Sequence, residues 1–393
     1  MIQLLSTHQY YTISHSDSLA SQLFQEDDSK KNTNKNTQDS KSNQFNLKLF
    51  NFQNVQYTGP LSIGDPDNTF EVIYDTGSAN IWIDSKQCSD IGCRNRKQYD
   101  HQKSSNYHAI NLQLDVQFGT GELIGNFSQD TVYFGGVEIE KQDFIEIQKQ
   151  IGAVFQDAKF DGIVGLAFPS MVAYNRNSLF DNLAKSKKIS KNIISFYMSN
   201  NAGSSDSQLT IGGYDKNKVL GQIHSHKIVK QYYWIFKADN ILVGKKDIGL
   251  CKGGCYLIAD TGTSLITGPS DSIYNLLNHL NVNDNCSNMN SLGDITFIAD
   301  GVEYNLKPEE YILKDDDAEM FVEASIRAGN TMKNKSASCM AGFMPLDIPN
   351  DEDDGFKYEK AWILGDIFLK KYVSIYDRDN NTVSFGVANH SSI

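Results

Sequence analysis

The sequence lacks two features that would place it in common classes of protein. It contains no run of about 18 apolar residues, the length that a transmembrane helix requires, so we expect no membrane span. It also lacks an excess of basic residues, because 36 Lys and Arg stand against 48 Asp and Glu, for a net charge of −12. Binding to nucleic acid requires clustered Lys and Arg, so we expect no nucleic-acid partner.

Proline is scarce and helical patterns are few. Only 7 residues are proline whereas 29 are glycine, and short β-type runs separated by Gly, Asn and Asp turns continue from Leu47 almost to the end. Strands are expected at 70–74, 193–198 and 373–376, and the best helix candidates are 179–187 and 270–280. With 40% hydrophobic residues the chain can bury a large core divided over two lobes. The pattern predicts a mainly β fold.

The N-terminal segment is poor in apolar residues. The run 1–8 turns polar too soon for a secretory signal. Residues 25–46 are almost wholly Glu, Asp, Ser, Lys, Asn, Thr and Gln, and such a composition buries too little apolar surface to fold alone. We therefore interpret residues 1–46 as the remnant of a pro-segment followed by a disordered tether.

The cysteines are even in number and partly closely spaced. Zinc binding is the alternative, but the close pairs have three or four residues between them and no His lies at ligand spacing nearby. Disulfides are therefore favoured, which indicates an oxidising compartment and a secretory signal upstream of this sequence. The six cysteines are Cys88 and Cys93, Cys251 and Cys255, and Cys286 with Cys339.

An internal repeat is the most informative feature. The motif Asp75–Ser78 follows an apolar run and is followed by another, and Asp260–Thr263 stands in the same setting. Downstream of each motif lies a short element of two apolar residues and a glycine, 163–165 in the first half and 363–365 in the second. A lone aspartate in such a turn most often bonds its own backbone. Because the motif occurs in two matched copies, we do not interpret Asp75 and Asp260 as ordinary turn residues.

Paired carboxyls suit one kind of chemistry in particular. Peptide hydrolysis without a covalent intermediate needs a base to deprotonate water and an acid to protonate the carbonyl oxygen and then the leaving amine. Two carboxyls held about 3 Å apart can do both, because like charges that close cannot both ionise and the pair shares one proton. Asp75 and Asp260 are the candidates, and the pKa values belong to the pair.

The other positions of each motif can hold these carboxyls in place. The glycine permits close approach of another backbone, and its amide can donate to the inner carboxylate oxygen. The threonine before it can tie the two loops together, and the hydroxyl after it can donate to the outer oxygen. These supporting residues are Thr76, Gly77, Ser78, Thr261, Gly262 and Thr263.

Together these motifs resemble the pepsin-like aspartic protease family over roughly residues 47–389, and the likeness includes 160–170, 362–366 and 376–378. The resemblance implies a bilobal fold, with an N-terminal lobe at 47–215, a C-terminal lobe at 216–393 and the active-site cleft between them. It implies an aspartic endopeptidase, a hydrolase that cuts extended polypeptides at acid pH. It also implies no cofactor or metal, a monomer, and inhibition by pepstatin-type peptides.

Disulfide pairing follows from the same resemblance rather than from spacing. The implied bridges are Cys88–Cys93, Cys251–Cys255 and Cys286–Cys339. By loop entropy the last contributes roughly 4 kcal/mol to stability and each short one about 2 kcal/mol.

The family's flap, a hairpin that folds over the substrate, corresponds to residues 116–121. Phe118 stands where the family has a tyrosine whose hydroxyl bonds the indole of the residue corresponding to Trp82. Gly119 and Thr120 can still offer backbone groups to the substrate. The loss of the hydrogen bond between the tyrosine hydroxyl and the indole costs about 0.5–1.5 kcal/mol, so phenylalanine at this position is expected to change the rate of cleavage moderately and not to abolish it. Phe155 and Tyr233 are expected to line the cleft.

Other features bear on processing and location. We interpret 315–338 as a surface insertion and the acidic run 351–354 as a solvated loop. The pro-segment has no evident basic run that would pair with the two aspartates, which argues against self-inhibition in the family manner. Five glycosylation sequons suit a glycoprotein zymogen of the lysosome, of a vacuole or of the extracellular space. They begin at Asn126, Asn285, Asn334, Asn380 and Asn389.

A second hypothesis keeps the fold but not the chemistry. A relative that binds peptides without cutting them usually has one aspartate or its glycine altered, and both motifs are intact here. Only Phe118 favours that alternative, so the active enzyme is the stronger prediction.

Overall fold

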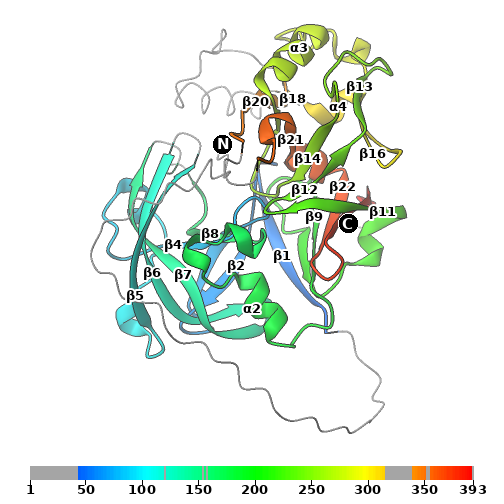
Figure 1. Cartoon of the computed structure of the whole chain (residues 1–393). Helices are drawn as coiled ribbons and strands as arrows, with labels where there is room; N and C mark the ends of the chain where they lie inside the picture. Colours follow the sequence, from blue (N-terminus) through cyan, green and yellow to red (C-terminus); the bar gives the residue numbers. More distant parts are fainter. Residues whose placement is uncertain are drawn as a thin grey trace, which may run out of the picture.

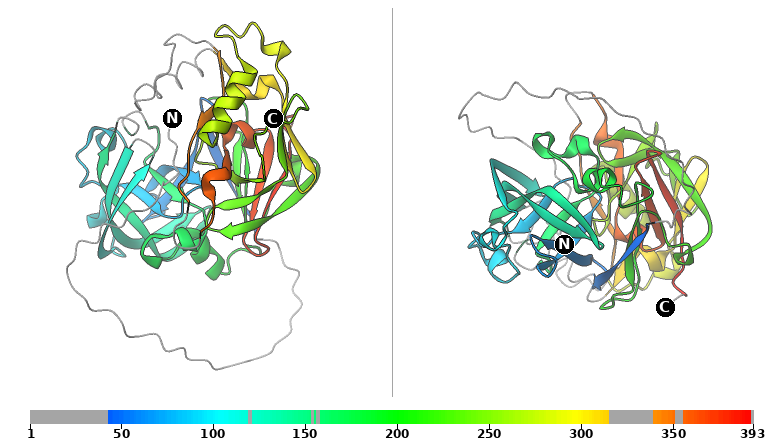
Figure 2. Two further views of the ribbon diagram at one scale, coloured as in Figure 1. Left: turned by 45° about the horizontal axis from the view of Figure 1, so that its top comes forward. Right: turned by 90° about the horizontal axis from the view of Figure 1, so that it is seen from below.

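The chain folds into a mainly β structure with two lobes, which confirms the predicted fold class. The computed structural model describes residues 43–118, 121–152, 155, 158–314, 339–350 and 355–391. In Figure 1 the strands of residues 56–165, blue to teal, gather on one side and those of the second half, green to red, on the other, while the first strand of the chain lies between the two groups. The two further views in Figure 2 show the same division.

Several predicted segments lie outside the described residues: positions 1–42, Gly119 and Thr120, and the segments 315–338 and 351–354. One predicted boundary needs correction. The first strand, β1, spans Phe45–Phe52, so positions 45 and 46 belong to the folded chain and not to the tether. The reason is that Phe45 pairs with Ile211 and packs against the main core.

The first lobe is a sheet in which β8 lies between β3 and β4, and β7 connects β4 to the long hairpin of β5 and β6. Over its first six residues β6 alternates buried and partly buried positions, as expected for a strand with one face on the core. The strands are β2 Gln56–Ile63, β3 Thr69–Asp75, β4 Ile81–Asp84, β5 His108–Phe118, β6 Gly121–Phe134, β7 Val137–Ile151 and β8 Gly162–Gly165.

The second lobe repeats part of this arrangement and adds two small sheets. β21 lies between β14 and β15, and β12 and β20 extend the sheet on its two sides. The strands are β12 Trp234–Ala238, β13 Asn240–Val243, β14 Cys255–Ala259, β15 Ile266–Gly268, β16 Ile295–Ala299, β17 Val302–Leu306, β18 Ile312–Lys314, β19 Cys339–Ala341, β20 Phe343–Pro345 and β21 Ala361–Leu364.

A further sheet joins the two halves of the chain. Its order is β1, β10, β9, β22, β23 and β11, all antiparallel neighbours. Because this sheet contains strands from both sides of positions 215 and 216, the lobe boundary drawn there stays a prediction. The bounds are β9 Ile193–Tyr197, β10 Ser207–Ile211, β11 Val219–Gln231, β22 Tyr372–Asp377 and β23 Thr382–Ala388.

The sequence repeat corresponds to one structural unit that occurs twice. In the first copy β3 runs parallel to β8, with Asp75 opposite Gly165, and β4 pairs with the other edge of β8. In the second copy β14 runs parallel to β21, and β15 pairs with the other edge of β21. The downstream element of two apolar residues and a glycine is therefore the strand that holds the arms of each Asp-containing turn together.

Helices are short and few among the described residues. Both predicted helices are present, α2 at Leu179–Lys185 and α3 at Ser270–Leu280. The hydroxyl of Ser178 caps α2 by accepting from the backbone N–H of Asp181. The other α-helices are single turns, α1 Ile91–Arg94, α4 Pro308–Tyr311 and α6 Asp366–Leu369. Turns of 3-10 helix lie at His101–Lys103, Pro169–Met171, Ala173–Asn175, Lys216–Lys218, Met289–Ser291 and Tyr358–Lys360.

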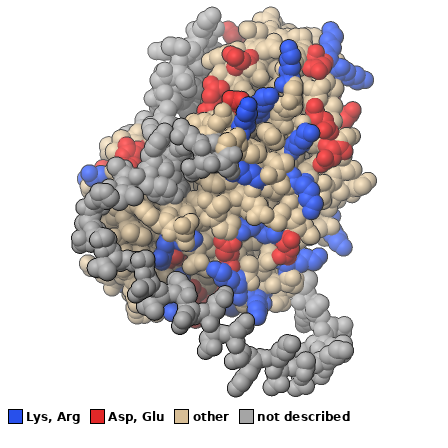
Figure 3. Space-filling view, viewed as in Figure 1, with Lys and Arg blue, Asp and Glu red and all other residues tan. Residues whose placement is uncertain are grey.

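No described helix is both long and apolar enough to cross a membrane. On the face drawn in Figure 3, acidic and basic side chains alternate over the second lobe without forming a patch of one sign. The described residues also contain no group of three or more His, Cys, Asp or Glu that could hold a metal ion.

Three disulfides are present with the pairing that the resemblance implies: Cys88–Cys93, Cys251–Cys255 and Cys286–Cys339. Their sequence separations are 5, 4 and 53 residues. Cys339 begins β19 and lies opposite Lys314 in the small sheet of β18 and β19.

Removal of the long-range bridge is expected to cost the most stability. The double variant Cys286→Ala, Cys339→Ala should lose about 4 kcal/mol of unfolding free energy, against about 2 kcal/mol for Cys88→Ala, Cys93→Ala, because the longer loop loses more entropy on closure. Urea unfolding followed by tryptophan fluorescence measures both. Equal losses in the two double variants would contradict the loop-entropy account.

Candidate active site

Asp75 and Asp260 occupy equivalent places in the two repeated units. Asp75 is the last residue of β3, and Asp260 directly follows β14. Both are fully buried, with 0% of their surface exposed. The adjacent chain holds the start of each turn: the N–H of Leu166 donates to the carbonyl of Asp75 at 2.8 Å, and the N–H of Asp260 donates to the carbonyl of Leu364 at 3.2 Å.

The two turns face each other across the lobe junction. A Cβ placed on Gly77 would lie 2.6 Å from the carboxyl of Asp260, and one placed on Gly262 would lie 2.3 Å from Oδ1 of Asp75. Each glycine therefore provides the space in which the carboxyl of the opposite turn sits. Two aspartates 185 positions apart in the sequence are brought into one site in this way.

Each carboxyl receives the same pair of hydrogen bonds from its own turn. At Asp75 the N–H of Gly77 donates to Oδ1 at 2.7 Å and the hydroxyl of Ser78 donates to Oδ2 at 2.5 Å. At Asp260 the N–H of Gly262 donates to Oδ1 at 2.8 Å, and the hydroxyl of Thr263 donates to Oδ2 at 2.7 Å. These four donors fix the carboxyl planes.

The threonines of the two turns are bonded to each other. The N–H of Thr76 donates to Oγ1 of Thr261 at 3.0 Å, and the N–H of Thr261 donates to Oγ1 of Thr76 at 3.0 Å. Their hydroxyls donate onward to the carbonyls of Ala259, at 2.9 Å, and Tyr74, at 2.6 Å. This reciprocal pattern ties the lobes together directly beneath the carboxyls.

The electrostatics favour a shared proton. Burial raises the pKa of Asp75 well above its usual value, and the neighbouring charge of Asp260 raises it further. Burial also raises the pKa of Asp260, against which the hydrogen bonds from Thr263 and Gly262 act. Because burial and mutual repulsion both disfavour two negative charges, the pair holds one proton to a higher pH than an ordinary aspartate does.

Two further groups that the sequence does not predict as site residues lie near the catalytic turns. The carboxyl of Asp366 is buried, and burial together with the charge of Asp260 raises its pKa well above the usual value. The hydroxyl of Tyr376 lies 3.5 Å from Oγ1 of Thr76. Asp366 therefore lies near Asp260 of the second turn, and Tyr376 lies beside Thr76 of the first. Only the fold brings these side chains to the site.

The predicted cleft residues fall on both lobes. Trp82 lies on β4 and packs in one buried cluster with Phe155 and with Val116 of the flap strand. Phe118 ends β5 and pairs with Gly121 across the hairpin, so the predicted flap lies in the β5–β6 hairpin.

Tyr233 lies on the second lobe and is buried. Burial raises its pKa well above the usual value. The ring packs in one buried cluster with Ala79, the residue that follows the Asp75 turn. Whether Tyr233 and Phe155 contact substrate stays a prediction.

Comparison with known proteins identifies the family. A model of the eukaryotic aspartyl proteases matches residues 56–388. The chain belongs to the eukaryotic aspartyl protease family. This aspartyl protease is 38% identical to cathepsin D of Rattus norvegicus over 357 residues, which cover 86% of this chain and 82% of the relative. It is 35% identical to pepsin A of Sus scrofa over 343 residues, which cover 85% and 82% of the two chains.

A third relative of this aspartyl protease, cathepsin E of Cavia porcellus, is 36% identical over 350 residues, covering 87% of this chain and 84% of the relative. These matches confirm the predicted family and the prediction of an aspartic-type endopeptidase, a hydrolase of peptide bonds.

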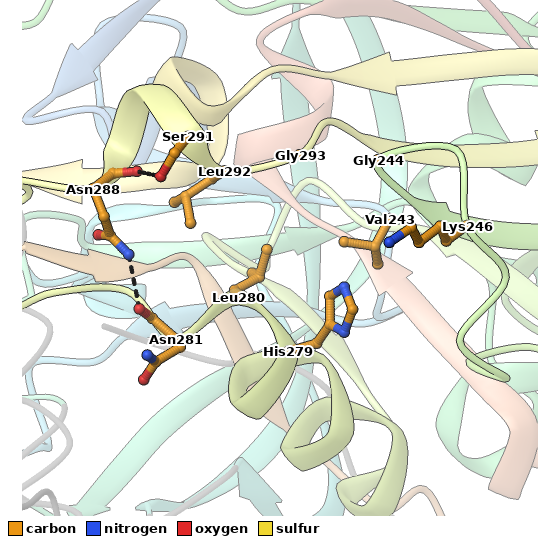
Figure 4. Close-up of a pocket in the computed structure, with 10 residues that line it drawn as sticks. All are labelled: Val243, Gly244, Lys246, His279, Leu280, Asn281, Asn288, Ser291, Leu292 and Gly293. Atoms are coloured by element: carbon orange, nitrogen blue, oxygen red, sulfur yellow. Dashed lines mark hydrogen bonds between the residues drawn. The ribbon is translucent and has the colours of Figure 1, made fainter.

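A separate hollow lies in the second lobe of this aspartyl protease, at the C-terminal end of α3. Its volume is about 280 Å³. Figure 4 shows His279 and Leu280 on the helix, with Lys246 on the opposite side and the amide of Asn288 bonded to the carbonyl of Asn281. None of its ten lining residues carries a carboxyl, so this hollow lacks the acid–base pair that the Asp75–Asp260 site contains.

Proposed function

We propose that Asp75 and Asp260 are the catalytic pair of this protease and that they hydrolyse peptide bonds of extended polypeptides at acid pH. The observation that carries the proposal is the arrangement of the two fully buried carboxyls, each lying against the glycine of the opposite turn. Matched hydrogen bonds from the turns support both carboxyls. A structural role alone does not require this symmetry around two charges of like sign.

The proposed reaction uses one proton that moves between the carboxyls. The ionised carboxyl takes a proton from a water molecule as the water oxygen bonds to the substrate carbonyl carbon, and the protonated carboxyl gives its proton to the carbonyl oxygen. When the C–N bond breaks, one carboxyl gives its proton to the nitrogen of the leaving amine, and the other takes the proton of a hydroxyl of the tetrahedral intermediate as the C=O bond of the new acid forms. The products are a carboxylic acid and an amine, and the pair again holds one proton. Ser78 and Thr263 keep the outer oxygens oriented throughout.

Substrate binding is proposed to involve the flap and the turns. Backbone groups of Gly77, Gly262, Gly119 and Thr120 and the ring of Phe118 would contact the extended chain, with the side chain of Thr263 nearby. Trp82 supports the flap from below, in the cluster that it shares with the flap strands. We further propose a monomer that binds pepstatin-type peptides.

The location is proposed from the disulfides. Three bridges form and persist in an oxidising compartment, which supports a lysosomal, vacuolar or secreted protein.

The pH dependence follows from the raised pKa values. Because both pKa values are raised, the singly protonated pair is present at acid pH and is lost as the pH rises through its upper pKa. Cleavage of denatured haemoglobin by the purified protein, from about pH 2.5 to about pH 7.5, should therefore be greatest on the acid side. Pepstatin should abolish it.

The same assay distinguishes the alternatives. Activity that is greatest near neutral pH and insensitive to pepstatin would contradict the shared-proton pair. No cleavage at any pH, even after acid incubation to release the N-terminal segment, would favour a peptide-binding protein and make Phe118→Tyr the first variant to prepare.

A further inference from the structure

A buried arginine in the first lobe bonds three groups at once. Its side chain is 7% exposed. Nε of Arg96 donates to Oδ2 of Asp84 at 2.7 Å, Nη1 donates to the carbonyl of Phe155 at 2.8 Å, and Nη2 donates to Oε1 of Gln150 at 2.7 Å. We call Asp84, Arg96, Gln150 and the carbonyl of Phe155 the Arg96 cluster.

The Arg96 cluster is closed and closely packed. Nε2 of Gln150 donates to Oδ1 of Asp84 at 2.6 Å, so the two acceptors of the arginine also bond each other. A Cβ on Gly92 would lie 2.3 Å from Oε1 of Gln150 and 2.9 Å from the carbonyl oxygen of Phe155. The turn of α1, held by the Cys88–Cys93 bridge, therefore lies directly on the cluster.

The cluster connects three parts of the proposed active site. Asp84 ends β4, the strand that follows the Asp75 turn and carries Trp82. Gln150 lies near the end of β7, opposite Leu123 of the flap strand β6. The ring of Phe155 packs with Trp82 and Leu123 in one buried cluster.

Arg96 also contacts an aromatic ring of that same cluster. Its guanidinium lies 5.9 Å from the ring centre of Phe160, which is 4% exposed. The arginine thus fixes the backbone of one aromatic residue and covers the side chain of another. We call the rings of Trp82, Phe155 and Phe160 the aromatic floor beneath the flap.

A buried ion pair is a poor source of net stability, because removing both charges from water offsets most of their attraction. What the pair does supply is a fixed geometry, because the guanidinium is planar and rigid. With two of its nitrogens bonded to Asp84 and Gln150, the third holds the carbonyl of Phe155 in one position. A lysine would keep the charge but could not reach all three acceptors with this geometry.

We propose that Arg96 is a positioning residue that acts through Phe155 to set the shape of the substrate pocket above the aromatic floor. The inference rests on the proposed function, since it requires that the floor lie beneath bound substrate. Arg96 itself touches neither Asp75 nor Asp260 among its described contacts, so it is not assigned to the chemical step.

The test is the substrate selectivity of Arg96→Lys. kcat and KM are measured at acid pH on peptides that differ by Phe, Leu or Ala, first immediately before and then immediately after the scissile bond. At one of these two positions, the preference for Phe over Ala should fall about tenfold, because the loss of one or two hydrogen bonds lets the floor shift. The preference at the other position should change less than about twofold.

A matched control is present in the same lobe. Arg176 donates to both carboxylate oxygens of Asp143 at 3.0 Å, and it makes no described contact with the Arg96 cluster. Arg176→Lys should leave both preferences within about twofold of the wild type. Gly92→Ala, which crowds the carbonyl of Phe155 from the other side, should alter the same preference as Arg96→Lys.

Each result decides the question. A uniform fall in kcat/KM for all peptides, or selectivity equal to that of Arg176→Lys, would overturn the positioning role while leaving the proposed function intact. If Arg96→Lys fails to fold, unchanged selectivity in Gly92→Ala overturns it instead. Wild-type protein that cleaves none of the peptides would overturn the proposed function and this inference together.

Discussion

Asp75→Asn is expected to lower kcat/KM at acid pH by roughly 10³-fold, since general acid–base catalysis contributes about 10² to 10⁴ and the variant removes one of its two groups. The asparagine has nearly the same shape, so the hydrogen bonds from Gly77 and Ser78 can be made in part. What is lost is the exchangeable proton. Asp260 alone can hold a charge or a proton but cannot supply both within one turnover.

The control for this variant is a buried aspartate of the same lobe. Asp130 is 1% exposed and accepts from the hydroxyl of Tyr99 at 2.6 Å and from the N–H of Thr131 at 2.7 Å. Asp130→Asn should be active within a few-fold of the wild type even if it lowers the melting temperature. Initial rates on a quenched peptide, with circular dichroism to confirm folding, measure both variants. Full activity in Asp75→Asn would refute the assignment of the pair.

The sequence predicted the parts of the fold that repeat. Two copies of an Asp-containing turn, each flanked by apolar runs and followed by an apolar strand ending in glycine, predicted two equivalent units, and β8 and β21 are those strands. The sequence shows this pattern because each unit is local: short apolar runs bounded by turn residues indicate strands, and the glycine indicates close approach of another backbone.

The remaining features depend on contacts between distant segments. Nothing in the sequence around Asp84, Arg96 or Gln150 indicates that the three side chains meet, since a buried arginine and a solvated one look alike in one sequence. The strand pairing of Phe45 with Ile211 was missed for the same reason: a single aromatic residue at the end of a polar tract does not show its partner.

The same contrast holds within the site. The hydroxyl groups of Thr76 and Thr261 could be assigned to a link between the lobes because their motifs match. The burial of Asp366 could not be predicted, because the corresponding position in the first half, directly after Gly165, is the apolar Leu166 and indicates no role for a carboxyl. The roles of the central residues could be predicted because their motif occurs twice. The roles of residues that have no match in the other half became clear only from the structure.

Because the two turns fit closely, the substitution of a glycine, which has no side chain, is also expected to lower activity strongly. Gly262→Ala would place a Cβ 2.3 Å from Oδ1 of Asp75, and the ordinary backbone angles at this glycine leave steric overlap as the sole source of strain. Overpacking of this kind costs about 1–3 kcal/mol in stability. The effect on kcat is larger, about 10²-fold or more, because a shift of about 1 Å in a reacting group is enough to cause it.

Gly213→Ala is the matched control, since its added Cβ would meet only the side chain of Gln44, with Oε1 nearest at 2.6 Å, and this flexible side chain can move away. Its kcat should equal that of the wild type, and its thermal stability should change little. If Gly262→Ala is also as active as the wild type while remaining folded, the two turns cannot lie as closely as their glycines indicate. Asp75 and Asp260 could then not share a proton, and the mechanism would have to assign the acid and the base to different groups.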